Sequence, residues 1–145
     1  MKKIISASFI LGISIFADLL SAQEITKDQM KAFQSDNVDV FKSAFSKNDF
    51  NKCLTVKENS YNLLAYSVKY ERKNVFNYLL SNNVNVNQIC DNQSPLMVAA
   101  RYGKADMAKT LIQKGADKNL KNENGETAKD FAVKYGNPSL AAILK

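Results

Sequence analysis

The sequence predicts an all-α solenoid of about four helix–turn–helix units, and three observations support this fold class. First, landmark residues recur after 32 positions: Asn62 corresponds to Ser94, Leu79 to Leu111 and Asn87 to Asn119. Second, residues that start and end helices lie at equivalent places in successive copies. Third, apolar residues follow the three-and-four spacing of helices with one buried face. A single helix pair cannot bury its apolar faces alone, so the pattern indicates stacked repeats.

The copies can be followed in order along the chain. The expected repeats span residues 26–56, 57–90, 91–121 and 122–145, and the first and last are expected to act as caps. The third copy is the clearest and the first is the faintest. In the first copy, the expected core residues are Ala32 and Phe33 in the inner helix, Val40, Phe41, Ala44 and Phe45 in the outer helix, with Asn48 in the turn.

Side chains that can cap helix N-termini mark where the helices begin. Ser94 and Thr127 offer hydroxyl groups at equivalent positions. Pro95 follows Ser94 where its fixed φ suits the first helical turn and its missing N–H costs nothing. The remaining starts are a capping box from Thr26 to Gln29 and the pair Asn137–Pro138.

The expected helix ends are residues that tolerate a left-handed backbone. Gly103 closes an inner helix and Gly115 closes an outer one. Asn83 and Asn48 occupy positions that match Gly115, whereas Glu71 replaces the glycine expected in the second copy. We therefore expect two short antiparallel helices in each repeat.

These motifs resemble the ankyrin repeat family. Residues 94–97, 99–103 and 115–119 read Ser-Pro-Leu-Met, Ala-Ala-Arg-Tyr-Gly and Gly-Ala-Asp-Lys-Asn. They are similar to the family signature of Thr-Pro-Leu-His, Ala-Ala-x-x-Gly and Gly-Ala-Asp-x-Asn. The signature histidine is replaced by Met97, Ala65 and Asp130 in the recognisable copies. The resemblance covers about residues 26–145 and implies a concave face of inner helices and projecting turns, which in this family binds proteins.

A basic residue followed by tyrosine recurs at the end of each recognisable inner helix, and the resemblance implies that these pairs point to the concave face. The candidate binding residues are Lys69, Tyr70, Arg101, Tyr102, Lys134 and Tyr135, bordered by the turn residues Asp91 and Gln93. Tyrosine and arginine are enriched at binding hot spots, and the basic residues favour an acidic partner. The alternative is that the tyrosines only pack against their neighbours.

The sequence leaves the state of its two cysteines open. Cys53 and Cys90 fall in successive turn segments, and a bond between them would stiffen the first half of the array. Stacked helices lie about 10 Å apart, whereas bonded cysteines require Cα atoms within about 7 Å. That spacing argues for two free thiols, although irregular loop lengths could close the gap.

Residues 1–22 are predicted to be a signal peptide. Lys2 and Lys3 precede an uncharged apolar run over residues 4–16, and Ala22 precedes the expected cut. An uncleaved membrane helix is the alternative, although the run is short for a bilayer span. We therefore expect residues 23–145 to be periplasmic or secreted, without a membrane span after cleavage.

Composition argues against catalysis. The chain has no histidine, which removes the commonest general base and metal ligand. No paired carboxylates, phosphate-binding loop or nucleophile motif is recognisable, so we expect a protein that is not an enzyme and has no metal or cofactor. The net charge is +6, or +5 without Lys2, Lys3 and Asp18, but the basic residues are too dispersed to indicate nucleic acid.

Two functions remain. The first is an exported, monomeric protein-binding scaffold, such as an inhibitor, an immunity protein or a stress-related regulator. The second is an envelope-associated structural protein that its basic charge attaches to an anionic surface.

Overall fold

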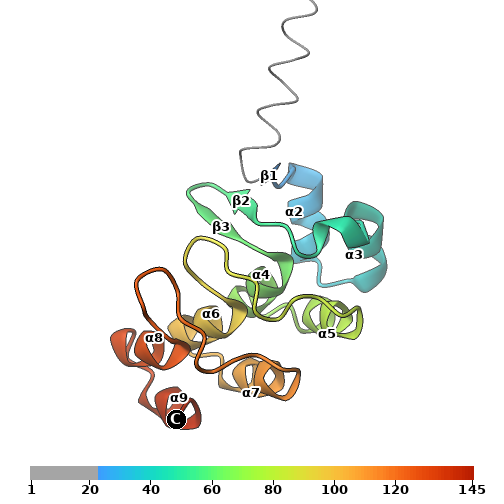
Figure 1. Ribbon diagram of the computed structural model, residues 1–145. Helices are drawn as coiled ribbons and strands as arrows, with labels where there is room; N and C mark the ends of the chain where they lie inside the picture. Colours follow the sequence, from blue (N-terminus) through green and yellow to red (C-terminus); the bar gives the residue numbers. More distant parts are fainter. Residues whose placement is uncertain (1–22) are drawn as a thin grey trace, which may run out of the picture.

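The computed structural model describes residues 23–145, and the predicted signal peptide at residues 1–22 lies outside this part of the chain. Figure 1 shows two rows of helices, with loops projecting from one side. The inner row contains α2 (Lys27–Gln34), α4 (Leu63–Lys69), α6 (Pro95–Tyr102) and α8 (Ala128–Lys134). The outer row contains α3 (Val38–Ala44), α5 (Lys73–Ser81), α7 (Ala105–Gln113) and α9 (Pro138–Ile143). The predicted helical solenoid is therefore confirmed.

The inner helices begin at the capping residues that the sequence predicts. The Ser94 hydroxyl accepts a hydrogen bond from the Met97 amide at 3.2 Å, and the Thr127 hydroxyl accepts one from the Asp130 amide at 3.4 Å. A complete capping box also starts α2 at Thr26. Each cap satisfies amide groups that the first turn of a helix leaves without partners.

The start of α9 differs from the prediction. Pro138 occupies the first turn, but the Asn137 side chain does not cap the helix. Its amide instead donates to the carbonyl oxygens of Ala100 at 2.8 Å and Arg101 at 3.3 Å. Asn137 therefore ties the last repeat to the end of α6, because that end has carbonyl groups without intrahelical partners.

Most of the expected helix ends are left-handed, as predicted. Gly103, Gly115 and Asn83 have φ values of 66°, 97° and 55°. Glu71 adopts the same conformation at φ 53°, and its carboxylate forms a 2.8 Å ion pair with Lys104 of the next repeat.

Asn48 lies in the turn after α3, as predicted, but it is not left-handed, because it stands inside a short 3₁₀ helix, Lys47–Asp49. The chain turns there by a capping box in which the Ser46 amide donates to the Asp49 carboxylate at 2.9 Å.

The core runs continuously between the two rows of helices. Leu79, Leu96 and Leu111 are almost completely buried in the second and third repeats. In the first repeat, the Phe41 ring stacks on Phe45 at 4.8 Å between centroids. Val40, which we expected in this core, is exposed because its neighbour Phe41 takes the buried face of the short helix α3.

A small sheet, not predicted from the sequence, covers the N-terminal end. Its strands are β1 (Gln23–Glu24), β2 (Leu54–Val56) and β3 (Asn59–Tyr61), in the order β1-β2-β3. β1 is parallel to β2, and β2 and β3 form an antiparallel hairpin. The buried Tyr66 hydroxyl lies 3.1 Å from the carbonyl oxygens of Leu54 and Asn59, and so fixes this hairpin on α4.

Three loops, here called fingers, project beside the inner helices at residues 54–61, 90–93 and 122–126 (Figure 1). In the second finger, Cys90 and Gln93 exchange both backbone hydrogen bonds, at 3.1 and 3.0 Å. Its tip meets the third finger, because the Asn92 carbonyl accepts from the Asn122 amide group at 3.1 Å. The second and third fingers are thus hydrogen-bonded to each other.

Candidate binding face

The six basic and tyrosine residues singled out from the sequence lie at the ends of successive inner helices. We call Lys69, Tyr70, Arg101, Tyr102, Lys134 and Tyr135 the ladder. The exposed fractions of Tyr70, Tyr102 and Tyr135 are 42%, 36% and 41%. The structure therefore places a basic residue and a half-exposed aromatic ring in each of three consecutive repeats.

Cations of the ladder lie between tyrosines of neighbouring repeats. The Lys69 Nζ atom is 5.3 Å from the centroid of the Tyr70 ring and 5.5 Å from that of Tyr102. The Arg101 Cζ atom is 5.4 Å from the Tyr102 centroid and 4.9 Å from that of Tyr135. These distances are within the range of cation–π attraction, about 0.5–1 kcal/mol at an exposed site. The ladder is therefore a connected surface rather than six separate side chains.

The cations differ in whether a carboxylate neutralises them. Lys134 pairs with Glu126 at 3.2 Å. Within residues 23–145, Lys69 and Arg101 form no ion pair with a carboxylate. The positive charge of the ladder is therefore least compensated on α4 and α6. An acidic group of a partner would be attracted most strongly to these two helices.

Packing accounts for part of the ladder. The Tyr70 ring is stacked on Tyr66, with 6.2 Å between centroids and an interplanar angle of 11°, and meets the edge of Phe33 at 6.5 Å. One face of Tyr70 thus belongs to the core, while over a third of the side chain remains exposed. Packing and recognition are compatible here, because packing holds each ring rigidly for contact.

Of the two candidate turn residues, only Asp91 is exposed. It lies at the tip of the second finger with φ 47°. Gln93, which we expected at the border of the face, is only 7% exposed. It lies beneath the ladder because its side chain bridges two others: it accepts from Arg101 Nη1 at 3.4 Å and donates to the Tyr61 hydroxyl at 3.5 Å.

Tyr61, at the end of the first finger, supports the ladder from below. This side chain is fully buried, and the Lys69 Nζ atom lies 5.0 Å from its ring centroid. The pKa of Tyr61 is raised to about 12, mainly because the side chain is buried and to a smaller extent because Tyr102 lies nearby. In the sequence, Tyr61 stands at the end of a turn segment, two residues before the first buried leucine of α4.

Cys53 and Cys90 form a disulfide with 5.5 Å between their Cα atoms. The spacing argument for two free thiols was therefore wrong. The separation of about 10 Å holds between helix axes, whereas these cysteines lie next to the first finger and at the base of the second. Cys90 is only 3% exposed, so the bond lies mostly beneath the surface.

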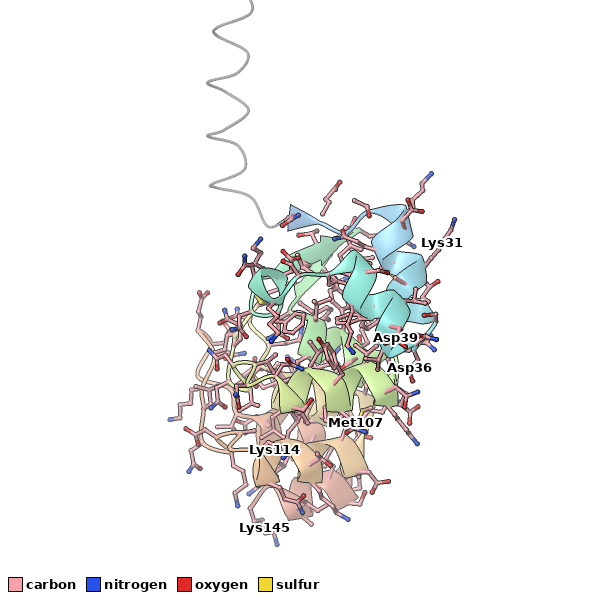
Figure 2. All side chains as sticks on the ribbon, turned by 90° about the vertical axis from the view of Figure 1, so that its right-hand side faces the viewer. Lys31, Asp36, Asp39, Met107, Lys114 and Lys145 are labelled. Carbon is pink, nitrogen blue, oxygen red and sulfur yellow. A yellow bond between two sulfur atoms is a disulfide. The ribbon has the colours of Figure 1, made fainter. Side chains whose placement is uncertain are left out.

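Hollows in the described part of the chain also lie outside the ladder. A polar hollow of about 730 Å³ lies between α3 and α5, on the side where Figure 2 shows Asp36 and Asp39. The Asp36 carboxylate accepts hydrogen bonds from the amides of Asn74 at 3.2 Å and Val75 at 3.0 Å, so it caps α5. A second, mainly apolar hollow of about 600 Å³ borders the largely exposed Val133 on the outer side of α8 and α9.

The described residues contain no group of three or more acidic or cysteine side chains arranged to hold a metal ion. Among residues 23–145, no helix combines the length and apolar character that crossing a bilayer requires.

Helix pairs that stack through inner and outer rows, with fingers beside the inner row, define a repeat scaffold with an extended binding surface. The family model for ankyrin repeats in three copies matches residues 29–122 and 90–145. The chain therefore belongs to the ankyrin repeat family. Ankyrin repeats generally mediate protein–protein interaction, and proteins of this family are typically scaffolds without enzymatic activity. Membership of this family therefore supports a protein-binding scaffold.

The chain is similar to segments of much longer proteins. A protein of Borreliella burgdorferi named as an ankyrin repeat protein is 27% identical over 114 residues, which cover 77% of this chain and 28% of the relative. The alpha-latroinsectotoxin-Lt1a of Latrodectus tredecimguttatus is 31% identical over 81 residues, covering 55% of this chain and 6% of the toxin. The chain thus spans less than a third of the length of these relatives, and the similarity lies in the repeats.

Proposed function

We propose that this chain is an exported, monomeric scaffold without enzymatic activity, which binds an acidic surface of another protein through the ladder. The supporting observation is that Lys69 and Arg101 lie between half-exposed tyrosines and have no carboxylate partner within the described residues. Rigid aromatic rings beside unneutralised cations favour contact with carboxylate-bearing surfaces. The partner we propose is an exported enzyme or toxin, which the scaffold inhibits or regulates.

Two features support export. Residues 1–22 have the charge pattern of a signal peptide. The Cys53–Cys90 disulfide favours the same location, because such bonds persist in oxidising compartments and are rare in the cytosol. Fractionation of cells that express a tagged chain tests this part of the proposal: we expect the tag in the periplasm or the medium. Recovery of the tag only in the cytoplasm would contradict it.

Binding through the ladder can be tested with variants of equal charge. The test variant is Lys69→Met with Arg101→Met. The control is Lys31→Met with Lys114→Met, which removes two exposed lysines that Figure 2 shows far from each other. Both variants lose two positive charges. In affinity capture from envelope and secreted fractions, we expect a stoichiometric partner with the parent and the control, and at least tenfold weaker binding by the test variant, or about 1.4 kcal/mol.

The same pair of variants separates this function from the alternative that the basic charge attaches the chain to an anionic surface. Attachment by net charge would weaken equally in both variants and would be released by moderate salt. A partner that binds both variants as tightly as the parent would move the binding site away from the ladder.

A further inference from the structure

The disulfide and the buried Gln93 side chain are parts of one connected unit. Cys90 and Gln93 exchange backbone hydrogen bonds of 3.1 and 3.0 Å across the tight turn formed by Asp91 and Asn92. Both turn residues are left-handed, with φ values of 47° and 60°. The backbone of Gln93 is therefore held in place relative to the sulfur atom of Cys90.

The other half of the bond is connected to Tyr61 in a similar way. Cys53 precedes Leu54, which pairs with Tyr61 across the β2–β3 hairpin. The Gln93 amide then donates to the Tyr61 hydroxyl at 3.5 Å. The disulfide, the hairpin, the side-chain hydrogen bond and the turn form a closed ring that contains Cys53, Leu54, Tyr61, Gln93 and Cys90.

This ring supports the middle of the ladder. Gln93 accepts from Arg101 Nη1 at 3.4 Å, and the Tyr61 ring lies 5.0 Å from Lys69 Nζ. The two hydrogen bonds of Gln93 are long, so a relative displacement of a few tenths of an ångström between the fingers breaks them.

We infer that Gln93 is a positioning residue for Arg101, and that the Cys53–Cys90 disulfide holds Gln93 in the position that this requires. The inference rests on the proposed function, because it gives the ladder a redox dependence: reduction of the disulfide weakens binding of an acidic partner. The reductant is a dithiol, whether of a protein or a small molecule.

The chemistry is a thiol–disulfide exchange. A thiolate of the dithiol attacks the sulfur of Cys53, which is less buried than Cys90, and releases the thiolate of Cys90. The second thiol of the reagent then attacks the mixed disulfide and releases Cys53. The dithiol loses two electrons and two protons to become a disulfide, and the chain gains both as two thiol groups. The first and second fingers are then no longer covalently linked.

The first test is a double-mutant cycle read by nuclear magnetic resonance. The chain has two arginines, Arg72 and Arg101, so their side-chain Nε–H signals are readily assigned with an Arg72→Lys variant. The cycle compares the parent, Gln93→Met, Cys53→Ser with Cys90→Ala, and the combined variant. Methionine keeps the length of Gln93 but removes both hydrogen bonds.

We expect Gln93→Met and the cysteine variant each to shift the Arg101 signal, and the cysteine changes to add nothing once Gln93 is methionine. The Arg72 signal should stay in place throughout. Additive shifts, or an Arg101 signal that does not respond to the cysteine variant, would overturn the inference. Because Gln93→Met keeps the disulfide and dithiothreitol reduces the unmutated parent, the test does not depend on folding of the cysteine variant.

The second test uses a hexaglutamate peptide as the acidic probe. We expect dithiothreitol to weaken binding of the peptide by the parent about threefold or more. The Gln93→Met variant should bind the peptide equally well with and without dithiothreitol. Equal loss in both proteins would show that reduction acts elsewhere and would overturn the inference. If the parent does not bind the acidic probe at all, the proposed function fails, whereas the resonance shifts still decide whether the disulfide positions Arg101.

Discussion

Removal of the Cys53–Cys90 disulfide is expected to lower the free energy of unfolding by about 4 kcal/mol. The two cysteines are 37 residues apart in the sequence. In the chain-entropy model, a cross-link that closes a loop of this size removes about 13 cal/mol/K from the unfolded ensemble, or about 4 kcal/mol at 25 °C. The Cα separation of 5.5 Å lies at the usual value for bonded cysteines. Backbone strain in the native state should therefore offset little of this stabilisation.

The variant for this measurement is Cys53→Ser with Cys90→Ala. Serine suits the half-buried position 53, whereas alanine avoids burying an unpaired hydroxyl group at position 90. Urea unfolding followed by circular dichroism gives the free energy. With a typical slope of about 2 kcal/mol/M, the midpoint should fall by about 2 M.

Dithiothreitol provides the internal control for this prediction. It should move the parent close to the variant and leave the variant unchanged. A loss below about 1 kcal/mol, with reductant still shifting the parent, would refute the entropic reasoning. It would mean that the unfolded chain already keeps the two fingers close together.

The remaining predictions concern the core and two titrating groups. Leu111→Ala should lower the free energy of unfolding by about 2–5 kcal/mol, because Leu111 is fully buried. Lys109→Ala, on the exposed side of the same helix, should change the urea midpoint little. Equal urea midpoints for the two variants would contradict the core assignment. Spectrophotometric titration should show Tyr61 ionising near pH 12. Because its folded pKa lies above the unfolded value of about 10, its contribution is complete below pH 10 and is lost as the pH rises towards 12; normal titration of all tyrosines in the folded protein would contradict this. Hydrogen bonds from Thr127 lower the pKa of Asp130, so its contribution is present above about pH 4 and is lost on further acidification. Asp130→Asn should flatten the acid side of the stability profile, and an unchanged profile would contradict this assignment.

The features that the sequence predicted well depend on a few neighbouring residues. Caps at Ser94 and Thr127, and the left-handed ends at Gly103 and Asn83, involve contacts within about four positions. Local chemistry therefore suffices to place them. The positions of the ladder residues followed from the resemblance to the repeat family, because one repeat sets the place of the next.

The features that were missed depend on contacts between repeats. Gln93 reads as an ordinary polar turn residue, but its burial depends on Tyr61, 32 positions away. The disulfide required the distance between two loops rather than between helix axes. Asn137 has the pattern of a cap, but its side-chain amide donates to the carbonyl groups at the end of α6, about 37 positions earlier in the chain. No local rule could rank such long-range partners above the local ones.

The contact of Asn137 with α6 has a consequence for the order in which the protein opens. In the described part of the chain, the last repeat packs against only one neighbouring repeat, so its amide protons should exchange soonest. Here Asn137, which directly precedes the last helix α9, donates a hydrogen bond to the carbonyl oxygen of Arg101 at 3.3 Å. Each opening of the last repeat therefore releases the end of α6 that carries the middle of the ladder. A partner that binds Arg101 should in turn slow hydrogen exchange in α9, a helix that it does not touch.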